Sequence, residues 1–330
     1  MTIASAALDN HWYAVATDDS VDTEPVGIEL RGERYVLWRT PAHGVRAARD
    51  RCPHRDAALS KGTVDDGCLR CPYHGWSFGG DGVCVEVPSS GSDARIPPTA
   101  QLALLAVDER YGLVWICPGE PRAPVPHISV DADNSFTRLN TEMQVWNCSA
   151  TRMIDNMLDV AHFPYTHVGT FGREQEKEVP HFSITRLDDT FTGYEYSVVV
   201  NNEGDAKAMS GGGADVIGLD MSTGFALPFT VRSTMSYENG IEQTLLMTAS
   251  PVSEERSLFT FVLWRNDDVS ETGQAIVDFE LEVALEDQQM LENLAGELSL
   301  DRGELVDVQS DKASVEWRRQ YRELVSPTSN

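Results

Sequence analysis

The chain lacks long apolar runs. No stretch of its 330 residues approaches the roughly eighteen apolar residues of a membrane-spanning helix. The N-terminus, Met1-Thr2-Ile3-Ala4-Ser5, has neither the charged nor the apolar region of a secretory signal. We therefore expect a cytoplasmic protein that has no membrane partner.

Positive charge and cysteine are also scarce. Lys and Arg number 26 against 52 Asp and Glu, giving a formal net charge of -26. Such a surface repels nucleic acid, which is therefore not expected as a partner. Two of the six cysteines belong to the motif described next, and the other four have no evident pairing partners, which fits a reducing compartment. These four are Cys68, Cys84, Cys117 and Cys148.

Two short cysteine-histidine pairs dominate what is present. Cys52-x-His54 is followed, after residues 55–70, by Cys71-x2-His74. Two thiolates and two imidazoles in this arrangement predict a Rieske [2Fe-2S] cluster, in which two Cys hold one iron and two His the other. A structural zinc site is the alternative, but zinc sites usually space Cys-Cys and His-His in separate pairs. Cys68 forms a C-x2-C with Cys71, yet only Cys71 has the following proline and histidine.

The segment 46–70 reverses the acidic balance of the chain. Its cations would form a basic collar that steers an acidic electron donor to the cluster. The alternative is that these cations pair with the neighbouring aspartates. The cations are Arg46, Arg49, Arg51, Arg55, Lys61 and Arg70, and the acids are Asp50, Asp56, Asp65 and Asp66.

A second group of polar residues lies in the segment 155–167. Asp159 and His162 are three residues apart, so on a helix they share a face. His162 and His167 would diverge on a regular helix, but Pro164 bends or ends it and lets His167 turn back. Two imidazoles and one carboxylate form the facial triad of a non-haem Fe(II) oxygenase.

A third ligand is expected from residues 274–298, which we predict to be helical. Apolar residues recur there at helical spacing, and Asp287 falls on the same stripe. A carboxylate facing an apolar core is costly unless a cation compensates it. Glu280, one heptad earlier, is the alternative ligand. The stripe comprises Ile276, Val283, Met290, Leu291, Leu294 and Leu298, whereas Glu282, Glu286 and Glu292 are expected to turn outward.

The chain divides at a proline-rich stretch. Residues 1–120 contain short β-rich segments at 11–16, 35–38 and 113–117, and the glycines of 79–82 predict a hairpin. Residues 121–126 are a stiff connector. Residues 127–330 mix helix and strand, with strands expected at 191–200 and 258–264. The glycine-rich stretch 204–213 is expected to be a loop, either a linker or a lid.

Together these motifs resemble the oxygenase components of the Rieske non-haem iron oxygenases, in particular the O-demethylase type that acts on vanillate and dicamba. The resemblance implies an α+β fold with an N-terminal Rieske domain of small antiparallel sheets and a C-terminal helix-grip catalytic domain with a large antiparallel sheet. It also implies a homotrimer. Asp159 would then link His74 of one subunit to His162 of the next, and Asn156 would lie close to the iron.

The resemblance further implies a terminal oxygenase. Electrons would come from a separate ferredoxin or flavin reductase, because the chain lacks a convincing Gly-x-Gly-x-x-Gly fingerprint. With O2, the Fe(II) would hydroxylate or demethylate a small organic substrate. A ring dihydroxylating dioxygenase, a Rieske electron-transfer protein and a non-catalytic helix-grip binding module remain alternatives.

The identity of the substrate is left open by the sequence. Aromatic ethers or acids and polycyclic or alkaloid-like compounds are the expected classes. Apolar side chains between residues 163 and 264 would form its pocket. The candidates are Phe163, Met221, Phe225, Phe229 and Trp264.

Overall fold

The structure is a computed structural model that describes residues 3–91, 95–294, 296, 298–301 and 303–326. The chain forms two compact units. One comprises Asp9–Val125, and the other comprises Met1–Leu8 with Pro126–Asn330. Each unit has its own sheets and its own buried core, so the two are described separately.

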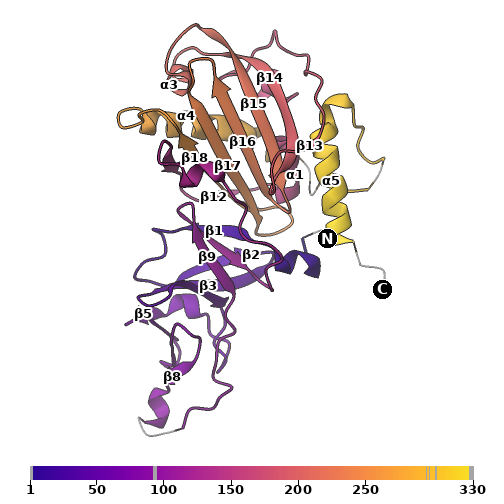
Figure 1. Cartoon of the computed structure of the whole chain (residues 1–330). Coiled ribbons are helices and arrows are strands. Elements are labelled where there is room, and N and C mark those ends of the chain that lie inside the picture. The colour runs from indigo at the N-terminus through magenta and orange to yellow at the C-terminus, as the bar shows by residue number, and fades with distance from the viewer. Residues whose placement is uncertain (1–2, 92–94, 295, 297, 302, 327–330) are drawn as a thin grey trace. The chain divides into compact units, whose positions relative to one another are not determined.

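The unit Asp9–Val125 contains three small antiparallel sheets (Figure 1). Their strand orders are β1-β10-β9, β2-β3-β4 and β5-β6-β7-β8. The strand predicted at 113–117 is β10, and a turn at Gly79–Gly82, closed by a hydrogen bond between these two residues, joins β7 to β8. The strands are β1 (Tyr13–Thr17), β2 (Val26–Leu30), β3 (Glu33–Thr40), β4 (Gly44–Arg49), β5 (Thr63–Asp65), β6 (Cys68–Arg70), β7 (Ser77–Phe78), β8 (Cys84–Glu86), β9 (Ala106–Arg110) and β10 (Leu113–Cys117).

The core of this unit lies beneath two loops. Trp38 of β3, Leu69 of β6 and Phe78 of β7 are fully buried, and Cys52 and Cys71 pack in the same cluster. The loop after β4 therefore begins with a buried cysteine, as does the turn between β6 and β7. Burial of both cysteines fixes the roots of the two loops, while the residues that follow them reach the surface.

The second unit is built on one eight-stranded antiparallel sheet (Figure 1). The order is β11-β18-β17-β16-β15-β14-β13, and β12 also pairs with β18. The strands predicted at 191–200 and 258–264 are β14 and β18. The strands are β11 (Thr137–Asn140), β12 (Gln144–Trp146), β13 (Thr185–Arg186), β14 (Thr192–Asn201), β15 (Val216–Ala226), β16 (Thr230–Tyr237), β17 (Glu242–Pro251) and β18 (Ser257–Arg265).

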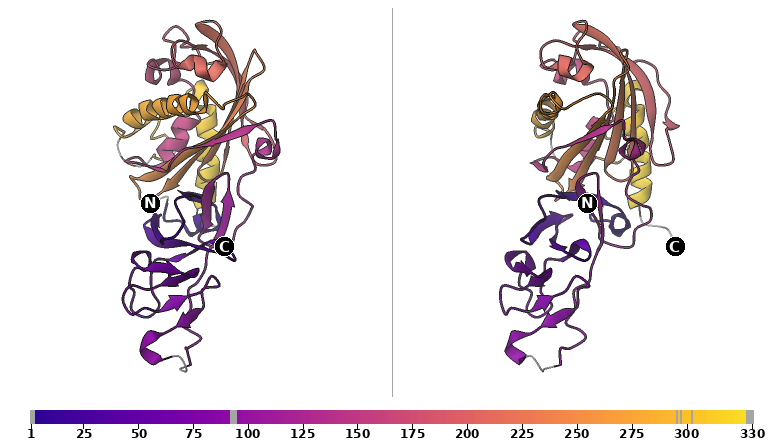
Figure 2. Two further views of the ribbon diagram at one scale, coloured as in Figure 1. Left: turned by 90° about the vertical axis from the view of Figure 1, so that its left-hand side faces the viewer. Right: turned by 60° about the vertical axis from the view of Figure 1, so that its left-hand side comes forward.

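Five α-helices of the described residues accompany this sheet. The long helix α4 lies across one face of it (Figure 2). The C-terminal helix α5 packs Trp317 and Tyr321 against Phe229 at the β15–β16 turn. The helices are α1 (Ala150–Met157), α2 (Phe163–Thr166), α3 (Ala206–Ser210), α4 (Gly273–Leu291) and α5 (Lys312–Val325).

Two local predictions need correction. The helix expected over 274–298 ends at Leu291, residues 292–294 form turns, and residues 295 and 297 lie outside the described part of the chain. The loop expected at 204–213 contains the short helix α3, because Gly211 in the left-handed conformation ends a helical turn there. Otherwise the predicted α+β architecture, with small sheets followed by one large antiparallel sheet, is confirmed. None of the described helices combines the length and the apolar composition needed to cross a membrane.

Candidate metal centres and active site

The two cysteine-histidine loops close in the same way. The amide of Cys52 donates to the carbonyl of Ala57 at 2.9 Å, and that of Cys71 donates to the carbonyl of Trp76 at 2.8 Å. Each loop needs one residue with positive φ to turn, which is Asp56 in the first loop and Gly75 in the second. Both loops therefore hold a cysteine at the root and a histidine near the tip.

The four expected cluster ligands converge. The side chains of Cys52 and Cys71 are hydrogen-bonded to each other. The rings of His54 and His74 lie 4.6 Å apart between centroids, and Trp76 stacks on His54 at 4.5 Å. The two loops thus bring two thiols and two imidazoles to one place.

This arrangement fits a [2Fe-2S] cluster. The Nδ1 atom of His54 is buried yet has no hydrogen-bond partner among the described residues, although a buried polar nitrogen normally has one. Burial raises the pKa of the Cys52 thiol to about 11, so a metal cation is needed to hold it as a thiolate. An orphaned imidazole nitrogen beside two buried thiols is the donor set that such a cluster uses.

The basic segment has mixed partners. Arg51 pairs with Asp56, and Arg70 pairs with Asp65 and Glu86. These pairs agree with the alternative in which the cations neutralise nearby acids. Arg55 is exposed on the first loop and makes no ion pair with any residue that the structure describes.

The local structure around Asp159 differs from the predicted helix. Helix α1, capped by the Ser149 side chain, ends at Met157, and Asp159 lies in the turn that follows. Its carboxylate accepts hydrogen bonds from the backbone amides of Ala161 at 2.9 Å and His162 at 3.1 Å. Asp159 and His162 still meet, because this turn wraps around the carboxylate. Pro164 lies in the first turn of the separate helix α2, which carries the chain on to His167.

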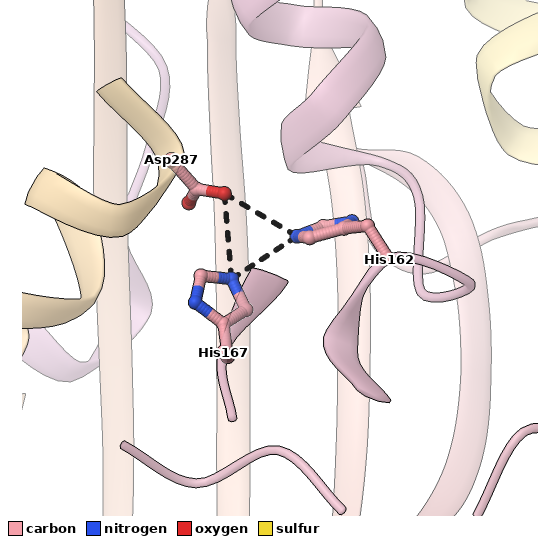
Figure 3. A group of neighbouring side chains, drawn as sticks. All are labelled: His162, His167 and Asp287. Atoms are coloured by element: carbon pink, nitrogen blue, oxygen red, sulfur yellow. Dashed lines mark hydrogen bonds and ion pairs between the residues drawn. The ribbon is translucent and has the colours of Figure 1, made fainter. Parts of the chain in front are cut away.

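Three side chains meet at one point of the second unit (Figure 3). The Nε2 atoms of His162 and His167 are 3.1 Å apart. The Asp287 Oδ1 atom lies 3.4 Å from the first and 3.3 Å from the second. The three ligand atoms lie within 4.8 Å of one another, a spacing that suits a single ion. Glu280, the alternative ligand, is not part of this group.

Each histidine is held on its outer side by a carboxylate. His162 Nδ1 lies 3.0 Å from Asp159 Oδ2, and His167 Nδ1 lies 2.9 Å from Glu286 Oε2. The hydroxyl of Thr170 donates to the same Glu286 oxygen at 2.7 Å. A carboxylate on the outer nitrogen fixes the ring and leaves Nε2 available to a metal.

The position of Glu286 corrects the expectation that it turns outward. Asp287 and Glu286 are consecutive on α4, so their side chains point about 100° apart around the helix. His167 lies between these directions and contacts Glu286 through Nδ1 and Asp287 through Nε2. The adjacent pair of acids in the sequence was the signal that could have identified Glu286. The apolar pattern of the helix does not predict the role of Glu286, because Glu286 lies outside the apolar face and is therefore expected to point to solvent.

The charges at this site are strongly coupled. Burial opposes a charge on His162, but Asp159 and Asp287 outweigh it and raise the pKa of this imidazole to about 9. Burial also opposes a charge on Asp287, yet the two histidines keep the pKa of this carboxyl well below its usual range. Two imidazole nitrogens and a carboxylate oxygen facing one another therefore provide a site for a cation. The residues fit a mononuclear Fe(II) with two histidines and one carboxylate.

Asn156 supports the third ligand. Its side-chain amide donates to Asp287 Oδ1 at 3.2 Å, the same oxygen that faces both histidines. Asn156 lies in the last turn of α1, and the hydroxyl of Tyr194 donates to the carbonyl of Leu158 just beyond it. Asn156 thus orients Asp287.

A mainly apolar cavity lies between α4 and the large sheet. Phe171 lines it and also stacks on His167, with ring centroids 4.8 Å apart. Among the five pocket residues expected from the sequence, Met221 lines this cavity, while Phe163 lines a neighbouring surface pocket. Phe225, Phe229 and Trp264 are buried and line neither pocket. The cavity therefore adjoins the histidine pair through Phe171.

The fold and the two centres together define a Rieske-type oxygenase component. Residues 11–103 match the Rieske [2Fe-2S] domain, and residues 146–326 match the vanillate O-demethylase oxygenase C-terminal domain. The second match spans more than half of the chain. The chain therefore belongs to the family of Rieske oxygenase components that carry this C-terminal domain.

Curated relatives agree with this assignment. The vanillate O-demethylase oxygenase subunit of Pseudomonas sp. (strain HR199 / DSM 7063) is 34% identical over 174 residues, which cover 52% of this chain and 48% of the relative. The chain thus matches about half the length of that relative. Methylxanthine N1-demethylase of Pseudomonas putida is 26% identical over 96% of this chain and 89% of its own length.

Solved structures show the same fold. The structure of the methylxanthine N1-demethylase with caffeine superposes with a TM-score of 0.82 at 26% identity, covering 97% of this chain and 91% of that one. Dicamba monooxygenase bound to 3,6-dichlorosalicylic acid gives a TM-score of 0.83 at 21% identity, covering 98% of both chains. A curated dicamba O-demethylase oxygenase component comes from Stenotrophomonas maltophilia.

Proposed function

We propose that this protein is the terminal oxygenase of a reductase-driven monooxygenase that hydroxylates a C–H bond of a small organic substrate. Where that carbon is a methyl group on oxygen or nitrogen, hydroxylation leads to loss of the methyl as formaldehyde. The observation that carries the proposal is the convergence of His162, His167 and Asp287 within 4.8 Å, beside an apolar cavity. A protein that only transfers electrons has no need of this triad.

The proposed roles follow from the contacts. Cys52, His54, Cys71 and His74 hold the cluster, and His162, His167 and Asp287 hold the mononuclear iron. When bound, these groups supply single electrons and activate O2. Asp159 holds the proton on His162 Nδ1, and Glu286 performs the same task for His167. Phe171 stacks on His167 and also lines the cavity, so it lies between the proposed iron ligand and the proposed substrate site.

We assign these tasks to two domains. Residues 1–120 form the cluster domain, residues 121–126 the connector, and residues 127–330 the catalytic domain. The two domain matches, which cover residues 11–103 and 146–326, support this division. Each proposed centre then draws all of its ligands from one domain.

The protein is proposed to act as a homotrimer in which each cluster serves the iron of a neighbouring copy. The support is an open concavity of about 1110 Å³ around Asp159 and His162. Its rim exposes apolar side chains, with Val306 exposed by 93% and Met290 by 49%. A second copy would cover this surface with the exposed tip of its cluster loops, where Tyr73 is 63% exposed. Asp159 would then contact His74 of that copy.

The electron donor is proposed to be a ferredoxin or flavin reductase in the cytoplasm. None of the six cysteines, all of which lie in the described part of the chain, forms a disulfide, which suits a reducing compartment. Arg55, exposed and outside any ion pair with the described residues, offers an acidic donor a contact at the first cluster loop. The steering would weaken as salt increases.

The substrate is proposed to be a small methylated aromatic or heteroaromatic compound. Two of the relatives that match this chain are named for demethylation, one of vanillate and one of methylxanthines. The cavity between α4 and the large sheet is lined mainly by apolar and aromatic side chains, which is the character of sites for such ligands.

Coupled turnover tests this function. The purified protein, supplied with NADH and a ferredoxin-reductase pair, is screened against methoxy- and N-methyl-aromatic compounds for substrate-dependent O2 uptake and formaldehyde release. We expect formaldehyde in step with O2 consumed for at least one compound, and none in His167→Ala. Reduction of the cluster without substrate-dependent O2 uptake for any compound would favour the electron-transfer alternative.

A further inference from the structure

One acidic side chain faces the cavity between α4 and the sheet. Glu280 is only 8% exposed and lines the cavity together with apolar residues of α4, β15 and β16. It precedes Asp287 by two turns of α4, so both lie on the side of the helix that faces the cavity and the histidines. Carboxylates are rarely buried unless a partner compensates the charge.

The carboxylate is held from behind. Gln243 Nε2 donates to Glu280 Oε1 at 2.6 Å, and Gln243 Oε1 accepts from Arg265 Nη1 at 2.9 Å. Gln243 and Arg265 are both 0% exposed, so this chain of contacts is rigid. It orients the carboxylate but offsets its charge only in part, because burial outweighs the nearby Arg265, which also forms a two-pronged ion pair with Asp267, both contacts at 2.8 Å.

The second carboxylate oxygen is left without a protein partner. Glu280 Oε2 makes no hydrogen bond to any described residue. Unlike the fully buried polar atoms that lack a partner in the described part of the chain, it is not completely shielded from solvent. It therefore borders open space. Burial raises the pKa of Glu280, which agrees with a carboxylate whose charge lacks full compensation in the unliganded protein.

The two asparagine side chains that line the cavity are already engaged. Asn201 accepts from Arg173 and donates to Gly172, while Asn202 donates to Gly212 and Ala214. No Lys or Arg occurs among the described residues that line the cavity. The walls are otherwise apolar, and they comprise Phe171, Val200, Ala206, Met209, Ile217, Leu219, Met221, Met235, Phe279 and Val283, with Tyr237 at one side.

We propose that Glu280 is the specificity-determining residue of this cavity, where its free oxygen receives a protonated amine or N–H group of an otherwise apolar substrate and disfavours substrates that carry a carboxylate. The proposal rests on the proposed function in that it takes this cavity as the substrate site. A carboxylate ligand would bring a second negative charge next to Glu280 without a cation to offset it. A cationic ligand supplies the missing charge, and the net charge of -26 draws cations to the protein.

The Glu280 carboxylate would restrict the substrate classes expected from the sequence. Aromatic acids, one of those classes, fit the cavity poorly, whereas alkaloid-like amines and N–H heterocycles fit it well. Alkaloid-like amines and N–H heterocycles have a flat apolar body that fits between the methionine and phenylalanine side chains of the cavity. They also carry a hydrogen-bond donor for the unpaired oxygen of Glu280.

Equilibrium binding of three matched probes tests the proposal. The probes are 4-methoxybenzylamine, 4-methoxyacetophenone and 4-methoxybenzoate, which differ mainly in the group opposite the methoxy. They are titrated by calorimetry into the iron-loaded protein without reductase, so that no turnover occurs. We expect the amine to bind at least about tenfold more tightly than the benzoate, because hydrogen bonds to charged groups are stronger than neutral ones. Tightest binding of the benzoate or the ketone, or no binding of any probe at millimolar concentration, overturns the proposal.

Two variants assign the effect to Glu280. Glu280→Gln keeps the shape and the contact with Gln243 but removes the charge, and it should abolish the preference for the amine over the benzoate. Glu282→Gln, an exposed neighbour on the same helix, should keep the wild-type preference. An unchanged preference in Glu280→Gln contradicts the role of this residue. The order of the probes on the wild-type protein tests the proposal even if the variant is unstable, and it does so independently of whether oxygenase activity is found.

Discussion

Glu286 Oε2 lies 2.9 Å from His167 Nδ1, and this contact has a counterpart in the 3.0 Å contact between Asp159 and His162. Both imidazoles thus turn their Nε2 atoms toward Asp287 because a carboxylate holds the opposite nitrogen. The two pairs differ in burial: the His167 side chain is 2% exposed, whereas His162 is 16% exposed and borders the open concavity. His162 is therefore the histidine through which the proposed contact with another copy would run.

Glu286→Ala is expected to weaken retention of the mononuclear iron. Loss of the outer carboxylate frees the His167 ring and lowers its basicity, and such changes typically cost about 10–100-fold in metal affinity. Iron content after dialysis against a weak chelator measures the effect, while the visible spectrum monitors the cluster. Glu282→Ala is the matched control. Equal iron retention in Glu286→Ala and the control would show that the contact does not support the metal.

Asp159→Asn is expected to keep both metals but slow transfer of electrons between them. The amide oxygen of Asn still accepts a hydrogen bond from His162 Nδ1, whereas the negative charge is lost. With substrate and O2 present, the reduced cluster should be reoxidised about tenfold more slowly or worse in a stopped-flow experiment. A rate equal to that of the wild-type protein would exclude this role.

Gly172→Ala is expected to destabilise the ligand-bearing segment. A Cβ at Gly172 would lie 2.2 Å from the carbonyl oxygen of Phe163 and 2.7 Å from backbone atoms of His167, so the backbone must move. We expect the thermal midpoint of the catalytic domain to fall by about 5 °C or more, together with loss of iron. Gly218→Ala is the control, because a Cβ there meets only Glu238 Oε1 at 3.8 Å. Similar midpoints for the two variants would contradict the close approach.

Asp155 should make stability depend on pH in mild acid. Burial raises the pKa of its carboxyl from 3.8 to about 6, although the ion pair with Arg318 opposes the shift. Between these two values the native state holds a proton that the unfolded state has lost, so stability falls as pH rises from about 4 to 6 and stays lower above it. Asp155→Asn should therefore gain stability relative to the wild-type protein over this window, by up to about 3 kcal/mol.

Urea unfolding at pH 4, 5, 6 and 7 measures this difference. The difference in free energy of unfolding between Asp155→Asn and the wild-type protein should change between about pH 4 and 6 and stay constant above about pH 6. Asp307→Asn, which removes the other carboxylate that pairs with Arg318, is a useful comparison. A difference between Asp155→Asn and wild type that does not vary with pH would show that Asp155 ionises normally.

The sequence indicated which side chains converge better than it indicated their local structure. The spacing of Cys52-x-His54 and Cys71-x2-His74 led directly to two loops that converge, because each pair lies within one turn. His162 and His167 meet Asp287 as expected, although the chain reaches them through a turn and the short helix α2. Helical spacing in the sequence cannot predict this turn, which is stabilised by hydrogen bonds from backbone amides to the Asp159 carboxylate.

The errors on α4 have one physical origin. The apolar stripe assumed a single buried face, yet Met290 and Leu294 are 49% and 43% exposed, and Glu286 is turned toward His167. Periodicity records which residues are apolar, but it does not distinguish burial within one chain from burial against another. The sequence predicts Glu280 only as an alternative iron ligand. It does not predict the contact with Gln243, because Gln243 is 37 residues away on β17 and has no sequence signature.

One chain is proposed to carry a [2Fe-2S] cluster and a separate iron held by His162, His167 and Asp287. The most direct measurement is iron per chain in the wild-type protein and in His162→Ala, with the visible spectrum of the cluster recorded on the same samples. We expect about three irons per chain in the wild type and about two in the variant, with equal cluster spectra, since the cluster alone holds two. About two irons in both proteins would contradict it.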